Sequence, residues 1–330
     1  MRDNYKYIYK RKYFFNFILI LSLYIIWTYK YEIICSKCIN INKYKKDECL
    51  ICKNNVIFKN IKIYDDEKTI DEIISKKKSI SRYGDGEFKL MFGLNLGFQR
   101  YNKEMSDRLY NILNSKEKNL LIGINVPYKP KNIDIFNPEA RDYYTKWLKK
   151  FRFKLAKILK NHEYYSSTIT RFYIDLKSKK GVPNYIKKLK KVWDQREVVI
   201  IEGEKSRLGV GNDLFDNMKS TERIICPTIN AFNKYKEIIN SIKKNVRKNK
   251  LILIALGPTA TILAYDLYKL GYRAIDIGHI DIEYEWFLRK ANTKIPIKNK
   301  YVNEIKKRKN KFTKVEDKSY FNQIIAQISR

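Results

Sequence analysis

Hydrophobic positions between residues 66 and 286 fall alternately into helical spacings and short apolar runs. Ile70, Ile73 and Ile74 share one side of a helix predicted over residues 67–77. The first half is further predicted to contain strands over 78–83 and 119–126 and helices over 88–96, 106–113 and 140–159. Segments of these kinds indicate a domain with a substantial core.

Strand, loop and helix follow one another more regularly in the second half. Short apolar or β-branched runs predict strands over 198–201, 223–226, 251–256 and 273–277. Residues 227–228 and 257–261 are each expected to open a helix, and Gly271 to end the second one. The alternation predicts an α/β fold, a Rossmann-like parallel sheet with flanking helices, whose site lies beyond the carboxyl ends of the strands.

The first 34 residues depart from this pattern. Basic residues precede residues 14–27, which are almost wholly apolar, as in a signal peptide or a membrane anchor. A spanning helix needs about 20 apolar residues, and no small-residue cleavage site follows the run. We therefore expect residues 1–34 to form an uncleaved membrane-anchor or interfacial segment, with a buried helix as the alternative.

Two Cys-x-x-Cys pairs come next, at Cys35 with Cys38 and at Cys49 with Cys52. Four thiolates at this spacing predict a zinc knuckle over residues 35–60, separate from a main domain at 61–305. Two disulfides or unligated thiols are the alternatives. The fifth cysteine, Cys226, ends an apolar run and is expected in the core. Residues 306–330 are expected to form a basic tail.

The composition adds a strong positive charge to this picture. The 330 residues are 44% hydrophobic, which excludes wholesale disorder, and their net charge is +34. Such a charge suggests that the protein binds an anionic partner, either a nucleic acid or another one such as a membrane surface. The lysines are scattered along the whole chain, however, whereas a nucleic-acid binder more typically concentrates them on one face or tail.

Residues 81–88 carry the strongest chemical signal. Asp85 and Glu87 are separated by one residue, with Gly84 and Gly86 beside them. In an extended segment both carboxylates would point to one face and converge on one cation. Mg²⁺ or Mn²⁺ is commonly held by one or two carboxylates plus the phosphates of a substrate. The alternative is a glycine-rich turn with solvated carboxylates.

Two later loops are suited to phosphate. Gly257, Pro258 and Thr259 would offer backbone N–H groups and a hydroxyl at a helix start. The loop after residues 198–201 offers an arginine beside flexible backbone; its candidate residues are Glu202, Ser206, Arg207, Gly209, Gly211, Asn212 and Asp213. Neither loop is a Walker loop or a dinucleotide fingerprint, and an ordinary strand-to-helix turn is the alternative for each.

The segment 278–286 places three polar groups after the last predicted strand. His279, Asp281 and Glu283 alternate with isoleucines and could supply a metal ligand or a general base. A solvated strand or a first helical turn would show the same pattern. A histidine-based metal site is disfavoured because the chain has only two histidines.

Several blocks together resemble the bacterial GT-D-type glycosyltransferases, in order and at plausible spacing over roughly residues 66–304. The blocks are RYGDGEF (82–88), FQ (98–99), TRFY (170–173), EGEKSRLGVGNDLF (202–215), CPTINAF (226–232), LGPTATILAYDL (256–267), DIGHIDIEYEW (276–286) and KYVNE (300–304). The resemblance implies a transferase that uses a nucleotide-sugar donor, commonly UDP-glucose, and a divalent cation on Asp85 and Glu87. It implies acceptors among adhesin glycans, capsule and other surface polysaccharides.

The resemblance also suggests roles for single residues. Arg82 and Arg171 would contact the diphosphate or the sugar, together with the two phosphate loops. Asp281 or Glu283, and third His279, would take the proton of the acceptor hydroxyl.

In a bacterium the catalytic domain would face the cytoplasm from the membrane, and in a eukaryote it could be luminal. A basic, zinc-knuckle nucleic-acid-binding protein is the alternative, and a Rossmann-like hydrolase is a third possibility.

Overall fold

A computed structural model describes residues 44–45, 48–49, 61–125, 130–159, 163–305 and 317–329. The first two pieces are short antiparallel strands, β1 (Tyr44–Lys45) and β2 (Glu48–Cys49). The apolar run at 14–27 lies outside the described residues, as do Cys35, Cys38 and Cys52; of Cys49 only the backbone is described. No helix within the described ranges is both long and apolar enough to cross a membrane.

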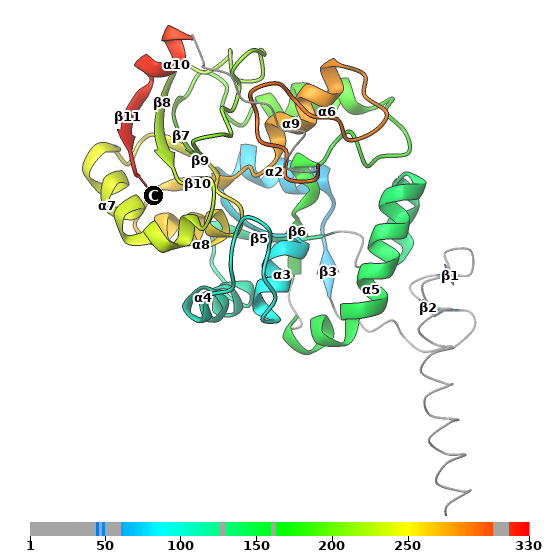
Figure 1. Cartoon of the computed structure of the whole chain (residues 1–330). Coiled ribbons are helices and arrows are strands. Elements are labelled where there is room, and N and C mark those ends of the chain that lie inside the picture. The colour runs from blue at the N-terminus through cyan, green and yellow to red at the C-terminus, as the bar shows by residue number, and fades with distance from the viewer. Residues whose placement is uncertain are drawn as a thin grey trace, which may run out of the picture.

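One nine-stranded sheet organises the rest of the chain (Figure 1), in the order β11-β8-β7-β9-β10-β4-β5-β6-β3. Every neighbouring pair runs parallel. The strands are β3 (Lys62–Ile63), β4 (Ser79–Tyr83), β5 (Leu120–Ile124), β6 (Glu163–Ser166), β7 (Glu197–Gly203), β8 (Ser220–Cys226), β9 (Leu251–Ala255), β10 (Arg273–Asp276) and β11 (Ile324–Gln327). The predicted Rossmann-like parallel sheet is confirmed.

Helices cover both faces of the sheet, as Figure 1 shows. One side carries α3 (Asp85–Met91), α4 (Lys103–Leu113), α7 (Tyr235–Asn245) and α8 (Pro258–Lys269). The other carries α2 (Asp66–Ser75), α6 (Val182–Lys190) and α9 (Ile280–Leu288). The helix α5 (Pro138–Ile158) packs its apolar side on the first layer. The remaining elements are short helices: the 3-10 helices η3 (Pro130–Ile135), η4 (Thr168–Thr170) and η5 (Ala231–Lys234), and the α-helix α10 (Lys318–Asn322).

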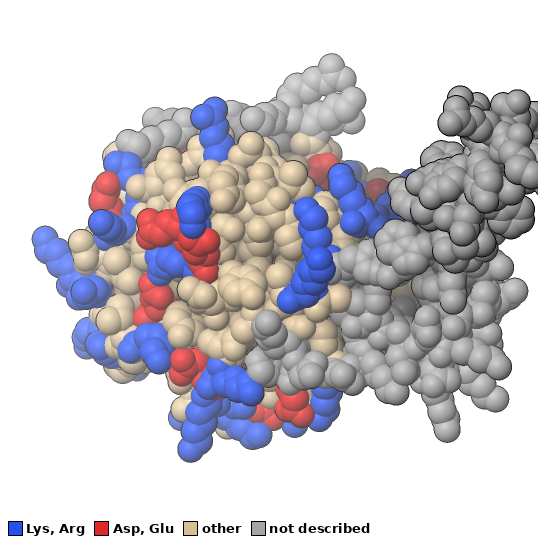
Figure 2. Space-filling model, turned by 90° about the horizontal axis from the view of Figure 1, so that it is seen from below, with Lys and Arg blue, Asp and Glu red and all other residues tan. Residues whose placement is uncertain are grey.

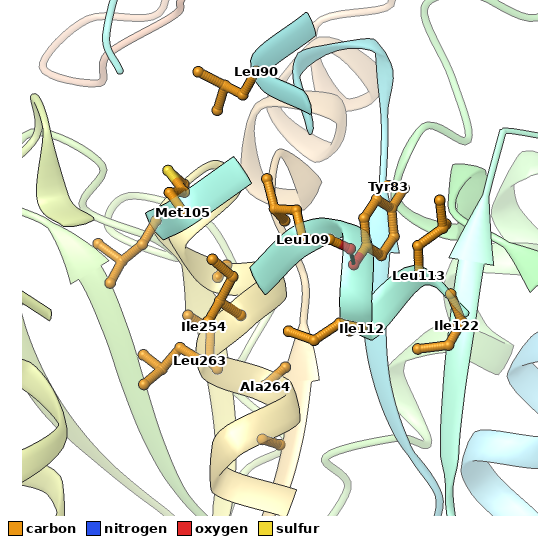
Figure 3. Packing of buried hydrophobic residues seen from close by; sticks show 14 of the residues in the cluster. Tyr83, Leu90, Met105, Leu109, Ile112, Leu113, Ile122, Ile254, Leu263 and Ala264 are labelled. Carbon is orange, nitrogen blue, oxygen red and sulfur yellow. Dashed lines mark hydrogen bonds between the residues drawn. The ribbon is translucent and has the colours of Figure 1, made fainter. Parts of the chain in front are cut away.

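Each face of the sheet has its own hydrophobic core. Figure 3 shows the first core beside β4, where the Tyr83 ring packs among side chains of α4. Its hydroxyl donates to the carbonyl of Leu109 at 2.8 Å, which satisfies a polar group that is otherwise fully buried. Cys226 is also in this core, as its sequence position predicted. These contacts fix the end of β4, from which the Asp85 loop starts.

Two predicted features are different in the structure. A helix was expected to begin at residues 227–228, but helical structure begins only with η5, followed by α7. Asn230, just before η5, takes a left-handed conformation (φ 52°) that a right-handed helix cannot include. Residues 324–327, assigned from sequence to the basic tail, form β11 and pair with β8. The edge strands β3 and β11, and β6 next to β3, are short and partly exposed, so their hydrophobic pattern is weak.

The charge is spread over the surface. Figure 2 shows lysine and arginine side chains interspersed with aspartate and glutamate on one face of the molecule. Many basic residues are paired with carboxylates, for example Lys188 with Glu67 and Asp71. On this face the expected dispersal of the basic residues is what the structure shows.

Candidate active site

A cavity of about 650 Å³ opens at the carboxyl edge of the sheet. Every strand from β8 to β6 in the sheet order ends at it, because parallel strands bring their carboxyl ends to one edge. The residues contributed just after these strands are Thr228, Ser206, Gly257, His279, Asp85, Asn125 and Ser167. Polar loops from both halves of the chain therefore meet in one cavity.

Asp85 and Glu87 both line this cavity, but not in the extended geometry expected from the sequence. They occupy the first turn of α3, which begins at Asp85 instead of at residue 88. Oε2 of Glu87 accepts the backbone N–H of Gly84 at 2.6 Å and so caps its own helix. The glycine places the cap without a side chain in the way. The two carboxylates thus reach the cavity from the first and third residues of α3.

The two carboxylates have different surroundings. Glu87 is 9% exposed. Its burial, opposed by backbone hydrogen bonds and assisted by the nearby charge of Asp276, raises its pKa to about 7. Oδ2 of Asp85 is more accessible and accepts from Lys89 Nζ at 2.6 Å and from the Tyr143 hydroxyl at 2.5 Å. A bound cation would stabilise the charged form of Glu87, which burial disfavours.

The donor set is suited to a hard divalent cation. Carboxylates of Asp85 and Glu87 are oxygen ligands, and Mg²⁺ or Mn²⁺ commonly takes one or two such groups and completes its shell with water and substrate phosphates. Among the described residues no group of three or more His, Cys, Asp or Glu side chains could hold a metal ion. The pair therefore fits a cation shared with a phosphate-bearing ligand better than a closed protein site.

Arg82 faces the cavity but is largely engaged within the protein. Its Nε donates to the carbonyl of Asp276, and its Nη2 lies 3.0 Å from the carboxylate of the same residue. Its Nη1 donates to Ser167 and to Thr170. Four of the five guanidinium N–H groups are thereby used. Arg82 joins the ends of β4, β6 and β10 beneath the cavity floor.

The loop after β7 is fixed by buried charges. Glu202 is fully buried, pairs with Arg223 Nη1 at 2.5 Å, and accepts the N–H of Leu208 at 2.7 Å. Its burial, offset in part by Arg223, raises its pKa. Ser206 lines the cavity, whereas Arg207 donates to the carbonyl of Asn299. The structure places Glu202 and Arg207 as supports of this loop, outside the residues that line the cavity.

The second half of the same loop is held by α9. Oδ1 of Asp281 accepts the N–H of Gly209 and the side-chain amide of Asn212, both at 2.9 Å. Asp213 bonds to Tyr284 and Lys190. Gly209 and Gly211 both have positive φ, which glycine adopts freely. None of the four predicted residues between 209 and 213 lines the cavity.

Of the three predicted acid–base residues, Glu283 lies furthest from the cavity. It is fully buried, and its Oε2 accepts the N–H groups of Tyr173 and Ile174 at 3.0 and 2.9 Å. Asp281 lines the cavity at 3% exposure, but its Oδ2 is 2.7 Å from the buried ammonium of Lys300. Both carboxylates are occupied by structural partners.

His279 and Arg171 meet at a residue that sequence reasoning left without a role. Nε2 of His279 lies 3.0 Å from Oε2 of Glu304, and Nη2 of Arg171 lies 2.6 Å from Oε1. Burial disfavours the charge of Glu304, but His279 and Arg171 outweigh that effect and hold its pKa well below the usual value. All three side chains line the cavity. In the sequence, Glu304 was noted only as the last residue of the KYVNE block at 300–304.

The start of α8 offers fewer donors than expected. Gly257 and Pro258 line the cavity, but Pro258 has no N–H, and the N–H of Ala260 donates to the carbonyl of Gly257. Thr259 is fully buried and is not among the lining residues. A Cβ at Gly257 would lie 2.8 Å from the Phe98 ring, so glycine lets this aromatic side chain close on the helix start.

Further lining residues come from elements with no motif of their own. Tyr143 and Tyr144 project from α5, and Lys294 pairs with Asp175 at 3.0 Å. Their separations along the chain are large, and no spacing signal joins them. The hydroxyl of Tyr143 on Asp85 is the contact that ties α5 to the carboxylate pair.

Comparison with known proteins identifies the fold. The profile of the family described as Glycosyltransferase GT-D fold matches residues 80–305. The chain belongs to this glycosyltransferase family. The resemblance noted from the sequence blocks is thereby confirmed.

Two streptococcal relatives extend this GT-D assignment. Probable glycosyl transferase Gly of Streptococcus gordonii is 37% identical over 267 residues, covering 80% of this chain and 38% of that protein. Glycosyltransferase GlyD of Streptococcus pneumoniae serotype 4 is 35% identical over 274 residues, covering 79% of this chain and 32% of that protein. The chain therefore matches about a third of the length of each relative.

Solved structures agree with the GT-D fold. A domain of unknown function 1792, described as having a distinct glycosyltransferase fold, superposes with a TM-score of 0.77 at 37% identity and covers 82% of this chain and 96% of that one. A glycosyltransferase from Streptococcus sanguinis gives a TM-score of 0.77 at 35% identity over 82% of this chain and all of that one.

Proposed function

We propose that this GT-D domain transfers a glucose-type hexose from a nucleoside diphosphate sugar, such as UDP-glucose, to a hydroxyl of a glycan, glycoprotein or glycolipid. The observation that carries the proposal is the carboxylate pair Asp85 and Glu87 at a cavity built from strand ends of a GT-D fold. Two carboxylates at the edge of this cavity suit a diphosphate that arrives with a divalent cation. Mn²⁺ or Mg²⁺ is the proposed cation.

The two ends of the cavity suit different ligands. The β7/β9 end is where the sheet order reverses, the usual nucleotide position in open α/β sheets. It supplies Ser206, Thr228, Gly257 and the Phe98 ring. The β5/β6 end supplies Tyr143 and other polar side chains. We assign the donor nucleotide to the first end and the acceptor to the second.

The chemistry follows from the leaving group. Cleavage of the bond between the sugar C1 and the diphosphate leaves an electron pair and negative charge on the phosphate oxygen. A cation held by Asp85 and Glu87 would supply electrostatic stabilisation of that charge. The chain contributes Arg171 at the cavity wall and orients the Ser206 loop through Glu202.

We further propose a cytoplasmic catalytic domain in surface-polysaccharide or adhesin-glycan synthesis, with residues 1–34 at the membrane and a zinc knuckle over 35–60. Nucleotide sugars in bacteria are cytosolic, and the streptococcal relatives make a bacterial setting the reasonable one. Residues 61–305 would form the catalytic unit. The nucleic-acid alternative is less well supported, since the cavity carries the carboxylates of Asp85 and Glu87 and the basic residues on the face in Figure 2 are interspersed with acidic ones.

Calorimetric titration of the full chain with UDP-glucose, with and without Mn²⁺, tests the proposal. We expect binding that requires Mn²⁺ and weakens at least tenfold in both Asp85→Asn and Glu87→Gln, because each variant removes one anionic oxygen ligand. Glu117→Gln, a surface carboxylate bonded to Lys269, is the control and should bind like the wild type.

Other UDP- and GDP-sugars follow if UDP-glucose does not bind. Binding that is independent of both the cation and the two carboxylates would contradict the assigned role of Asp85 and Glu87. Absence of binding to every nucleotide sugar would contradict the function itself.

A further inference from the structure

His279 is the one imidazole among the described residues that line the cavity. His279 ends the loop after β10 as the N-cap of α9, and its side chain is 16% exposed in the cavity wall. Nε2 lies 3.0 Å from Oε2 of Glu304 as an ion-pair contact, and no hydrogen bond to either ring nitrogen is found among the described residues. A neutral ring that carries its proton on Nε2, the nitrogen facing the anionic oxygen of Glu304, has its lone pair on Nδ1.

The carboxylates of the cavity are less suited to accepting a proton. Asp281 and Glu283 are buried and bonded to Lys300 and to backbone N–H groups. Asp175 lies 3.0 Å from Lys294. Asp85 and Glu87 are assigned to the cation. A group already held by cations or several donors is a weak proton acceptor, because those partners stabilise its anion.

We propose that His279 is the general base of the transfer reaction and that Glu304 is its positioning residue. This inference rests on the proposed function. The arrangement follows the logic of a base oriented by a carboxylate, in which the anion fixes the tautomer and stabilises the imidazolium that forms. Arg171 holds the other oxygen of Glu304 and so keeps the carboxylate in place.

The step balances in atoms and charge. The acceptor oxygen attacks C1 of the donor sugar while the bond from C1 to the diphosphate oxygen breaks, and the electron pair of that bond leaves with the diphosphate. The proton of the acceptor hydroxyl passes to Nδ1 of His279, which later releases it to solvent. Attack with a separate base proceeds from the face opposite the leaving group, so the configuration at C1 is inverted.

Several charges around His279 set its pH response. Glu304 from the 291–305 segment and Glu283 on α9 favour the imidazolium. Arg171, after η4, and the positive end of the α9 helix dipole oppose it. The carboxylate in direct contact has the largest effect, so its removal should favour the neutral ring.

Hydrolysis of UDP-glucose by the full chain with Mn²⁺, with water as acceptor, tests the proposal through release of UDP. We expect His279→Gln, which retains a donor toward Glu304, and His279→Ala to lower kcat by about 10²–10⁴-fold. UDP affinity should change less than about threefold, and imidazole should restore part of the turnover of His279→Ala. Glu117→Gln is the unaffected control.

The Glu304→Gln variant distinguishes positioning from support of the fold. The acid limb of its pH profile should move to lower pH, because the imidazolium loses its nearest anion. A structural role alone would scale the profile without moving it. NMR of the first product from UDP-α-glucose should show β-glucose.

Three results would overturn the proposal: wild-type turnover in His279→Gln, an unmoved acid limb in Glu304→Gln, or α-glucose as first product. If the wild type neither binds nor hydrolyses any nucleotide sugar, the proposed function is wrong, and this inference fails with it.

Discussion

Replacing Lys300 with methionine is expected to lower the free energy of unfolding by about 3–5 kcal/mol. The ammonium is 3% exposed and lies 2.7 Å from Asp281 and 3.0 Å from Glu285, whose carboxylates are equally buried. Methionine has a similar length but no charge, so two buried carboxylates would lose their shared cation. Breaking a buried pair on one side leaves an uncompensated charge, which accounts for the size of the effect.

Urea unfolding of the full chain, followed by tryptophan fluorescence, measures this change. Lys269→Met is a matched control: its ammonium is about half exposed and 3.1 Å from Glu117, and surface pairs of this kind contribute about 0–1 kcal/mol. Adding Asp281→Asn to Lys300→Met should recover part of the loss, because one buried charge is removed. Equal effects of the two lysine variants would contradict the buried-pair account.

The same lysine explains how three chain segments form one cavity wall. Lys300 belongs to the segment that delivers Glu304, and Asp281 belongs to α9. Asp281 in turn holds Gly209 and Asn212 of the loop after β7. The geometry at the cavity thus depends on a charge cluster lying behind it. Gly209 and Asn212 of the EGEKSRLGVGNDLF block (202–215) are thereby tied to the cavity wall although they do not line the cavity.

The central sheet could be predicted because its strands carry strong local signals. Residues 198–201 and 251–256 are continuous apolar runs, typical of strands buried on both faces, and they form β7 and β9. A local signal also marked the start of α8, where Gly257 and Pro258 were expected to open a helix. Edge strands pair on one side only and alternate weakly, so β11 could not be recognised.

The site was predicted where its residues follow a strand and missed where they pair across the chain. Asp85 and His279 are adjacent to strand ends, and the parallel topology brings them to one edge. The contacts of Tyr143 with Asp85 and of Glu304 with Arg171 join positions 58 and 133 residues apart. Only the folded chain defines such pairs.

The local geometry of Asp85 and Glu87 was mispredicted for a related reason. A spacing of two residues suggested an extended segment, but the carboxylate of Glu87 reaches the N–H of Gly84 and closes a helical turn. The same two residues therefore define a helix start. The hydrogen bond between Glu87 and Gly84, three residues apart, therefore outweighed the extended pattern.

Gly278→Ala is expected to weaken UDP-glucose binding or lower turnover by more than about tenfold. The same substitution should lower the free energy of unfolding by about 3 kcal/mol. Gly278 has φ of +44°, and a Cβ there would lie 2.2 Å from Nη2 of Arg82. The guanidinium would have to move, which would break its bonds to Asp276 and loosen the link between the ends of β4 and β10 at the cavity. Loss of charged hydrogen bonds adds to the backbone strain.

Gly271→Ala separates these two contributions. Gly271 also has positive φ (+83°), but its added Cβ would meet only the flexible Lys248 side chain, at 3.7 Å. Backbone strain alone should then cost about 1–2 kcal/mol and leave binding unchanged. On the Arg82→Met background Gly278→Ala should cost only the backbone strain of about 1–2 kcal/mol, because the clashing group is already gone. Additive effects in urea unfolding and UDP-glucose titration would show that Gly278 acts through the backbone and not through Arg82.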